Sequence, residues 1–600
     1  MAETVAEIVA AHRAGTSTPA DTVARCYERI RAHGDDAVFI ALRPENEVLA
    51  EARALAAEGQ SGRPLYGVPV AVKDNIDVRG LPTTAGCPAY AYRPKRDATA
   101  VERLKAAGAI VIGKTNLDQF ATGLVGVRTP YGIPRNPHNP KLIPGGSSSG
   151  SAVAVAAGLV PLALGTDTAG SGRVPAGLNN IVGLKPSLGL VSNAGVVPAC
   201  RSLDCVSIFA LTADDAWAAL CAIAGPDAAD PCTKAFALGA PGPLAPGTRI
   251  AVPRPADRKF FGDRRAKAAF DAACDLAARL GYAVIEIDLR PFLETARLLY
   301  DGPWVAERYA AVGDFIARHP KQAHPVTRKI ILGGKRATAV DAFQAFYRLA
   351  ELRGAAHRQL ACVDALMVPT APAAYTVDQV SRDPIGLNSR LGTYTNFVNL
   401  LELAGLAIPA TIAQDGTPFG VTFLAPAGRD ALLVSIGREF HAATGLTLGA
   451  LGVAQPRLPP LTAAPRSDEI AIAVVGAHLS GMPLNGELIK LGARFLKTTL
   501  TAPGYRLFAL ADARPQKPGL LRVADNDGVA IEVELWALPV AAFGKFVATI
   551  PPPLSIGTVT LADGETVKGF LVEAAAVAQA TDISSFGGWR AFVARQKLRA

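Results

Sequence analysis

The sequence has few of the residues that mark disulfide-rich, metal-binding or nucleic-acid-binding proteins. Eight cysteines occur among 600 residues, without a CxxC pair or a Cys/His spacing suited to zinc, so we expect reduced thiols and no metal site. The net charge of +9 comes from 61 basic and 52 acidic residues, which are spread along the chain without a Lys/Arg block. Nucleic-acid binding is therefore not indicated.

Apolar runs of membrane-spanning length are also missing. The richest run, residues 152–164, is interrupted by Gly158 and Pro161, which is typical of a buried helix leading to a core strand. The N-terminal residues 1–7 contain an early acidic side chain and no apolar segment, so we expect no signal peptide. These features predict a cytoplasmic protein that does not bind membranes.

Apolar residues are plentiful, at 50% of the chain, which is ample for a large core. Short apolar runs alternate with helical stretches, and this predicts an α/β fold with a mixed sheet between helical layers. The first 60 or so residues are predicted to be helical, with Thr16, Ser17 or Thr18 as N-cap before Pro19. The strongest strand candidates are residues 68–72, 109–112, 162–164, 249–252, 283–287 and 365–368.

The composition changes near residue 450. Four prolines and several alanines in residues 451–467 predict a stiff linker. Residues 468–600 open with the apolar run 470–475 and are numerous enough for a smaller, independent α+β domain. We therefore predict a first domain at 1–450, a linker at 451–467 and a second domain at 468–600.

Three residues in glycine-rich turns predict hydrolytic chemistry: Lys73, Ser147 and Ser171. A serine hydroxyl attacks an amide carbonyl efficiently only when a base removes its proton. Lysine acts as that base only when it is neutral, and lowering its pKa from about 10.4 to near 7 costs the ammonium form about 4 to 5 kcal/mol. The apolar neighbours Ala71 and Val72 are consistent with the burial that this requires.

These turns, and the interval of 171 − 147 = 24 residues between the two serines, resemble the amidase signature family of serine hydrolases. The resemblance covers about residues 20–445 and implies the family's α/β/α core. It also implies that Ser171 is the nucleophile, and that Ser147 carries the proton between Ser171 and Lys73. A cis peptide is implied before Ser147, where Gly146 is a suitable neighbour.

The oxyanion that develops during acyl transfer needs backbone N–H donors. The run of small residues that ends at the nucleophile is expected to supply them, and its members are Thr168, Ala169, Gly170 and Ser171. The loop 119–124 should also border the pocket, and we assign Gly123 to substrate binding.

Substrate choice depends on residues outside the triad. The segment 300–309 resembles the specificity segment of the allophanate hydrolases, in which a tyrosine and an arginine eight residues apart hold a small anionic substrate. Tyr300 and Arg308 have this separation, since 308 − 300 = 8. Allophanate is urea bearing a carboxylate, which a guanidinium group binds through two parallel hydrogen bonds.

The second domain supports the same interpretation, because allophanate hydrolases often carry such a tail. Its segment 476–485 resembles their C-terminal motif, in which a histidine is implicated in decarboxylating the first product, N-carboxycarbamate. His478 would be that residue. Glu532 and Glu534 alternate with apolar residues and share one predicted strand face, where they form either a second acid/base pair or, more simply, a solvated surface.

No cofactor is expected. Biotin needs a carrier lysine flanked by methionines, and the three methionines of the chain, Met1, Met367 and Met482, offer no such site. Allophanate would therefore come from a separate urea carboxylase or another allophanate-producing enzyme. The N-terminal helices and the large apolar content favour a homodimer.

Three other functions remain open. A glutamine-hydrolysing subunit of a tRNA amidotransferase would share the triad, but would need partner chains and has no evident use for residues 468–600. A broad-specificity amidase for apolar amides would also share it, but would not favour Arg308 in its pocket. The third is a non-catalytic scaffold protein, against which the intact Lys73, Ser147 and Ser171 argue.

Overall fold

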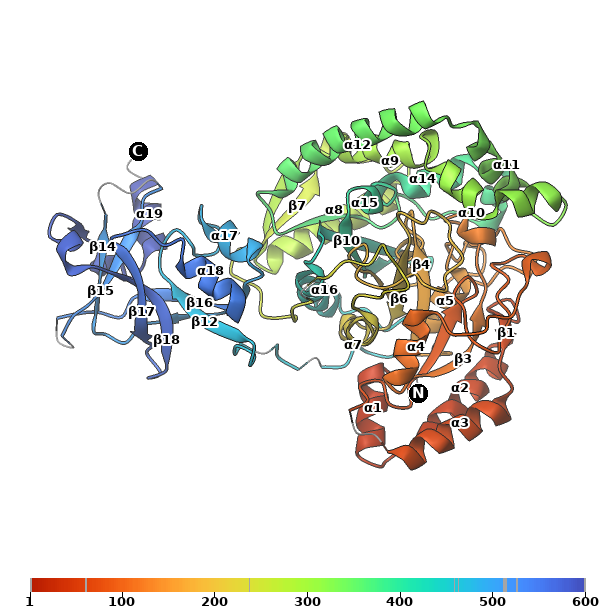
Figure 1. Cartoon of the computed structure of the whole chain (residues 1–600), viewed down its shortest axis with the longest axis horizontal. Coiled ribbons are helices and arrows are strands. Elements are labelled where there is room, and N and C mark those ends of the chain that lie inside the picture. The colour runs from red at the N-terminus through yellow and green to blue at the C-terminus, as the bar shows by residue number, and fades with distance from the viewer. Residues whose placement is uncertain are drawn as a thin grey trace. The chain divides into compact units, whose positions relative to one another are not determined.

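The chain folds into two compact units in a computed structural model, shown in Figure 1. The structure describes residues 3–59, 62–236, 238–457, 459–461, 463–510, 515–524 and 527–597. The larger unit comprises residues 1–238, 250–280 and 284–457. The smaller unit comprises residues 458–600 together with the short segments 239–249 and 281–283.

One mixed sheet of eleven strands organises the larger unit and confirms the predicted α/β class. All six predicted strands belong to this sheet. In spatial order its strands are β1 (Phe39–Leu42), β3 (Ile110–Thr115), β2 (Pro69–Lys73), β4 (Leu162–Asp167), β6 (Cys205–Ala210), β5 (Val182–Lys185), β10 (Leu403–Ile412), β11 (Pro418–Pro426), β9 (Ala365–Pro369), β7 (Arg249–Pro253) and β8 (Ala283–Ile287).

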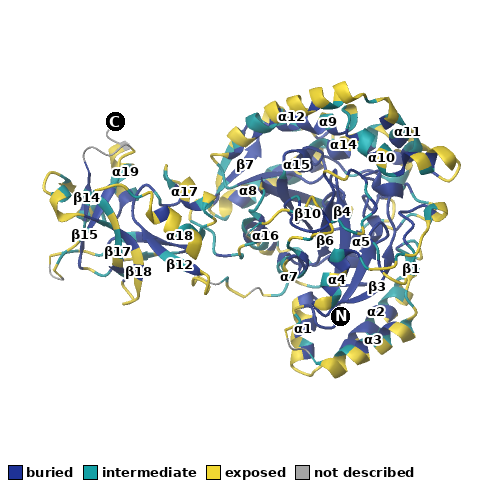
Figure 2. Cartoon of the chain, in the orientation of Figure 1, coloured by how far each residue is buried: buried dark blue, intermediate teal, exposed yellow. Residues whose placement is uncertain are grey.

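Helices surround this sheet, and Figure 2 shows the central strands buried while the helices expose their outer faces. The richest apolar run forms α5 followed by β4, as predicted. The helices are α1 (Val5–Arg13), α2 (Pro19–His33), α3 (Glu45–Glu58), α4 (Thr99–Ala106), α5 (Ser149–Ala156), α6 (Val174–Leu178), α7 (Ala213–Ile223), α8 (Arg264–Arg279), α9 (Arg290–Asp301), α10 (Val305–Arg318), α11 (Pro325–Gly333), α12 (Ala339–Leu360), α13 (Val377–Arg382), α14 (Gly386–Leu391), α15 (Phe397–Leu400) and α16 (Asp430–Thr444).

The N-terminal helices belong to the larger unit and pack their apolar faces onto the rest of it. Thr18 is the N-cap of α2, and its hydroxyl accepts the backbone N–H of Asp21 in a capping box. Helix α1 is anchored by the buried carboxylate of Asp215, which accepts the N–H groups of Val5 and Ala6 at 3.2 and 3.1 Å. An acidic group at a helix N-terminus satisfies otherwise unpaired donors.

The smaller unit is built on β-strands. A five-stranded sheet has the order β13 (Arg494–Leu500), β16 (Glu532–Pro539), β12 (Glu469–Val474), β18 (Thr566–Val572) and β17 (Leu554–Thr560). A three-stranded sheet contains β15 (Pro518–Arg522), β14 (Tyr505–Ala509) and β19 (Thr581–Asp582). The helices are α17 (Asn485–Lys490), α18 (Val540–Val547) and α19 (Trp589–Lys597). The predicted apolar run 470–475 supplies the central strand β12, whose side chains enter the core of this unit.

All eight cysteines are free thiols, four of them buried. Among the described helices, none is both long enough and apolar enough to cross a membrane. Within the same residues, no group of three or more His, Cys, Asp or Glu side chains is placed to hold a metal ion.

Candidate active site

Lys73 is the last residue of β2 and is completely buried. Its Nζ lies 2.8 Å from Ser147 Oγ and 2.7 Å from Thr166 Oγ1. Strands β2 and β4 run parallel, with Val72 opposite Leu164, so their carboxyl ends meet at one edge of the sheet. Parallel pairing thus brings a lysine and a threonine that are 93 residues apart into contact.

Burial lowers the pKa of Lys73 to about 7, although the carboxylates of Asp118, Asp167 and Asp204 act in the opposite direction. Desolvation penalises the ammonium form because water no longer stabilises its charge. A lysine with this pKa is partly neutral at neutral pH and can accept a proton. This is the property that a lysine base requires.

Ser147 lies in the turn that leads into α5. The peptide bond between Gly146 and Ser147 is cis, as the resemblance implied. Gly146 packs against the buried carboxylate of Asp118 so closely that a Cβ would lie 2.1 Å from its Oδ2. Asp118 itself is held by three backbone N–H groups, those of Val125, Gly126 and Arg128.

Ser171 follows the carboxyl end of β4 and is buried. Its Oγ donates a 3.4 Å hydrogen bond to the carbonyl of Gly123. Among the described residues there is no hydrogen bond between Ser147 and Ser171, so the structure joins Lys73 to Ser147 and joins Ser171 to Gly123. Gly123 and Gly146 both pack on Asp118, which links the two halves of the site.

The predicted oxyanion donors lie in the same turn. The backbone N–H groups of Thr168, Ala169 and Ser171 have no hydrogen-bond partner in the part of the chain that the structure describes. Gly170 differs from expectation, because its N–H already donates to Asp167 Oδ1 at 2.9 Å. Its role is steric instead: its φ is +130°, and a Cβ would lie 2.5 Å from Thr395 Oγ1.

A buried ion pair holds this turn in place. The guanidinium of Arg173 donates to both carboxylate oxygens of Asp167, at 2.9 and 3.0 Å, and both side chains are inaccessible to solvent. The same carboxylate also accepts the N–H groups of Gly170 and Gly172. Burial raises the pKa of Asp167, but Arg173, Lys185 and the N–H of Gly172 together outweigh this effect and lower the pKa below its usual value.

Asp204 connects the turn to a neighbouring loop. It accepts the hydroxyl of Thr168 at 2.5 Å and the backbone N–H groups of Ala199 and Cys200. Burial raises the pKa of this carboxyl group. The contact fixes the side chain of Thr168, so that its backbone N–H keeps one direction.

Tyr300 and Arg308 come together as predicted, at the end of α9 and the start of α10. Arg308 is buried, donates to Tyr300 Oη at 3.3 Å, and lies with Cζ 5.5 Å from the centre of the tyrosine ring. It also donates to Thr122 Oγ1 at 3.0 Å and to the carbonyl of Ala121 at 3.4 Å. Since Gly123 follows Thr122 and accepts from Ser171, one turn joins the arginine to the serine.

Arg308 differs from Arg173 in the groups that surround its guanidinium. Among the described residues, no carboxylate lies within ion-pair distance of the Arg308 guanidinium. The guanidinium of buried Arg173, by contrast, is paired with Asp167. A buried cation is costly unless an anion accompanies it. The site can therefore accept a small anion beside a serine and three free N–H donors, an arrangement suited to acyl transfer.

His478 belongs to the smaller unit, where it follows β12. Its Nε2 lies 3.0 Å from Glu487 Oε2, and its ring stacks on Phe570 with centroids 5.2 Å apart. Burial lowers the pKa of His478, while Glu487 opposes this effect. The imidazole borders a cavity of about 570 Å³.

Glu532 and Glu534 form neither an acid/base pair nor a fully solvated face. Glu534 is fully buried and accepts the N–H and hydroxyl of Ser480, the indole N–H of Trp536 and the guanidinium of Arg590. It is a structural group that fixes the segment containing His478. Glu532 is partly exposed and lies 3.7 Å from Arg590.

Several site residues were not predicted. They include Thr166, Asp204 and also Asn399, whose side-chain amide donates to the carbonyls of Asp167 and Leu203 at 2.8 Å. Strand pairing and loop packing bring these residues to the site and leave no local motif. Arg173 was recognisable in principle, because it stands two residues after Ser171 in the same motif and its partner Asp167 stands four residues before that serine.

We expect Arg173→Ala to reduce the free energy of unfolding of the larger unit by about 3 to 5 kcal/mol, because it leaves the Asp167 carboxylate buried and unpaired. Denaturant unfolding measures this loss. The matched control is Arg348→Ala, since Arg348 pairs with Glu294 at an exposed surface and its removal should change the free energy of unfolding far less. Equal losses in the two variants would contradict the assigned role.

The chain matches known proteins along most of its length. A family model described as Amidase matches residues 21–434, and one described as Allophanate hydrolase C-terminal domain matches residues 470–594. Urea amidolyase of Saccharomyces cerevisiae is 45% identical over 573 residues, which cover 93% of this chain and 31% of that protein. The chain thus spans about a third of the length of this relative.

Other relatives match along more of their own length. A glutamyl-tRNA(Gln) amidotransferase subunit of Chloroflexus aurantiacus is 33% identical, and the match covers 74% of this chain and 96% of that protein. The solved structure of selenomethionine-substituted Kluyveromyces lactis allophanate hydrolase is 40% identical, with a TM-score of 0.79 and coverage of 99% of both chains. The chain therefore belongs to the amidase family and carries an allophanate hydrolase C-terminal domain.

Proposed function

We propose that this protein hydrolyses allophanate to ammonia and N-carboxycarbamate. The observation that carries the proposal is Arg308, a buried cation without a carboxylate partner among the described residues, joined by the turn 121–123 to Ser171. Allophanate offers a carboxylate for the guanidinium and a terminal amide for the serine. The match to the K. lactis allophanate hydrolase structure over 99% of both chains supports the same substrate.

The mechanism begins with Tyr300 and Arg308 holding the carboxylate, with Gly123 bordering the bound substrate. Ser171 Oγ then leaves the Gly123 carbonyl and attacks the amide carbon, while Ser147 takes its proton and passes its own to neutral Lys73. Protonated Lys73 then returns a proton, through Ser147, to the departing ammonia. Water hydrolyses the acyl-enzyme by the reverse sequence and regenerates Ser171.

The carbonyl oxygen becomes negatively charged during both steps. The free N–H groups of Thr168, Ala169 and Ser171 are the donors that we assign to it. They lie in a buried turn, where hydrogen bonds to charge are stronger than in water. Gly170 supports this arrangement through its backbone conformation rather than through its N–H.

The alternatives fit the site less well. A tRNA amidotransferase subunit would not use residues 470–594, which match the allophanate hydrolase C-terminal domain. An amidase for neutral, apolar amides would leave Arg308 buried without a counter-ion. A non-catalytic scaffold protein would not need a lysine base whose pKa burial lowers to about 7.

We further propose that the smaller unit decarboxylates N-carboxycarbamate, with His478 as proton donor. One proton and the dianion −OOC–NH–COO− give carbon dioxide and the carbamate anion. A second proton converts carbamate to carbon dioxide and ammonia. The observations that favour this role are the position of His478 beside a cavity and its pairing with Glu487, which partly offsets the lowering of the His478 pKa by burial.

The remaining assignments follow from these proposals. Residues 1–450 would act as the amidase domain, 451–467 as the linker and 468–600 as the decarboxylating domain. The reaction uses no metal or cofactor, and allophanate would come from a separate urea carboxylase or another enzyme that produces it. The free cysteines support a reducing, cytoplasmic location.

A homodimer is also proposed, for a reason other than the one that the sequence indicated. The N-terminal helices bury their apolar residues within the chain. Helix α12, by contrast, exposes more than half of the surface of four large apolar side chains, which share one face: Val340, Phe343, Phe346 and Tyr347. Such a patch is typical of an interface.

We expect ammonia release from allophanate, and much less from glutamine or a neutral aryl amide, with Ser171→Ala as the blank. Arg308→Ala should raise KM for allophanate and reduce kcat/KM by about 100-fold or more, because the bidentate contact with the carboxylate is lost. Steady-state ammonia assays measure both quantities.

Neutral amides provide the control for this variant. Arg308→Ala should leave the weak hydrolysis of a neutral amide nearly unchanged. If the variant loses activity equally on allophanate and on the neutral amide, Arg308 does not recognise the carboxylate.

We expect kcat/KM to rise about tenfold per pH unit up to a pH of about 7 and then to level off, because only neutral Lys73 accepts the proton. The pH profile of the unaltered protein measures this. Lys73→Arg should be inactive throughout, since arginine stays charged, whereas Lys141→Ala, on the surface, should keep the normal profile. A flat profile across neutral pH would exclude Lys73 as the base.

We expect Phe343→Ser/Tyr347→Ser to convert the dimer to a monomer, because two exposed aromatic side chains are removed from the proposed interface. Sedimentation velocity measures the mass. Arg358→Ala, a polar change on the same helix, is the matched control. A monomeric unaltered protein would refute the proposed homodimer.

A further inference from the structure

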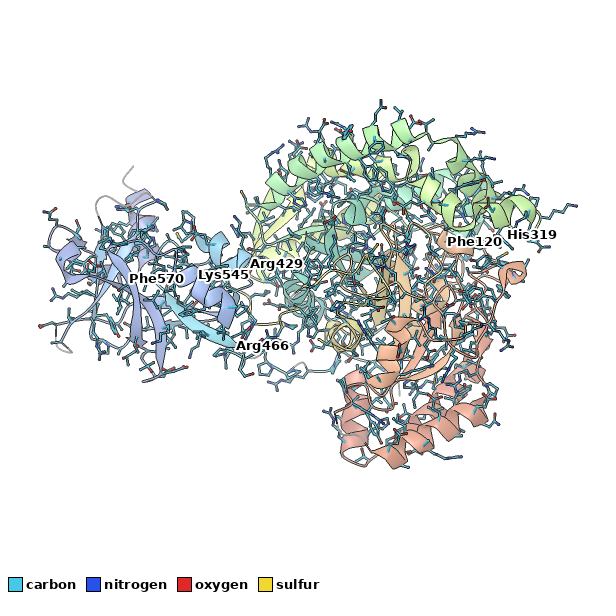
Figure 3. The ribbon with its side chains drawn as sticks, in the orientation of Figure 1. Phe120, His319, Arg429, Arg466, Lys545 and Phe570 are labelled. Carbon is cyan, nitrogen blue, oxygen red and sulfur yellow. The ribbon has the colours of Figure 1, made fainter. Side chains whose placement is uncertain are left out.

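The cavity beside His478 is unusually basic. Three lysines line it, and they come from different elements: Lys490 ends α17, Lys517 precedes β15 and Lys545 lies in α18. Lys545 and Phe570, two of the lining residues, are labelled in Figure 3. The lining contains one carboxylate, Glu487, and that group is already paired with His478.

The lysines have no counter-ion of their own. In the described ranges of the smaller unit, none of the three ammonium groups has an ion-pair or hydrogen-bond partner. Other lysines of this unit are engaged: Lys497 pairs with Asp563 at 3.3 Å, and Lys568 donates to Thr558 Oγ1 at 3.4 Å. The cations around the cavity therefore stay available for a ligand, and Lys517 is also partly withdrawn from solvent.

The other walls of the cavity limit the size and kind of ligand. Phe546, Phe570, Ile550 and Leu554 form apolar surfaces, beside which charge interactions are stronger than in bulk water. Lys490 and Lys545 themselves are exposed to solvent. Three ammonium groups against one occupied carboxylate match a small dianion better than a monoanion. A ligand with two carboxylates also places one of them beside His478.

We propose that Lys490, Lys517 and Lys545 bind the two carboxylates of a small dianion in this cavity, namely the N-carboxycarbamate that the amidase step releases. This inference rests on the proposed function. It assigns substrate recognition to the lysines and leaves proton donation to His478. A bound dianion also favours the imidazolium form of His478, so binding prepares the proton donor.

Malonate is the appropriate probe, because it carries two carboxylates on a methylene group where N-carboxycarbamate has NH. The chain contains eight histidines, so 13C-histidine NMR of the full-length protein gives few signals. The signal that disappears in His478→Asn identifies His478. We expect this signal to shift saturably with malonate, and at least about tenfold more acetate to be needed for the same shift, because acetate loses one charge-assisted contact.

The lysine variants test the assignment. Lys490→Gln, Lys517→Gln and Lys545→Gln should each weaken malonate binding about tenfold. Lys568→Gln, on the exposed surface of the same unit, should bind malonate normally. The inference is overturned if the His478 signal ignores malonate, or if the three cavity variants bind as the control does.

A separate measurement distinguishes failure of this inference from failure of the proposed function. Ammonia release from allophanate by the unaltered protein tests the amidase reaction alone. If ammonia is released but malonate does not bind near His478, the lysine assignment fails and the amidase proposal stands. If malonate binds but no ammonia is released, the proposed substrate fails and the cavity still takes a dicarboxylate.

Discussion

The chemistry of the larger unit depends on the complete burial of Lys73 at the end of β2. Burial lowers its pKa to about 7, which the proposed role of Lys73 as a base requires. The sheet provides this environment, because β3 and β4 flank β2 and close both of its edges. The same pairing places Thr166 against the amine and directs the turn that carries Ser171 to the same edge of the sheet.

Arg173 and Arg308 are both buried, but the partners of their guanidinium groups differ. The charge of Arg173 is paired with the carboxylate of Asp167, and the pair holds the turn that contains Ser171. Arg308 is satisfied only by neutral groups, a phenol, a hydroxyl and a carbonyl. The paired charge of Arg173 thus supports the structure, whereas the charge of Arg308 stays available to the anionic ligand that we propose for it.

The fold class, the six predicted strands and the contact of Lys73 with Ser147 could be predicted from sequence, because apolar runs and glycine-rich turns are local signals. The two longest described strands, β10 and β11, were not predicted, although they pair with each other as a local antiparallel hairpin. Asp204 was not predicted either, because its contact with Thr168 joins residues that are 36 positions apart. Gly170 shows a further limit. Its place in the motif indicated an N–H donor for the substrate, but the Asp167 carboxylate three residues earlier uses that donor.

The buried Glu534 has a consequence for the end of the chain. Through this carboxylate and through Ser480, Arg590 in α19 holds the segment that carries His478, across 110 residues of sequence. The last helix is therefore part of the support of the cavity and not a dispensable extension. Proteolysis or a fusion that unravels α19 would release the segment that carries His478 without altering any residue that lines the cavity.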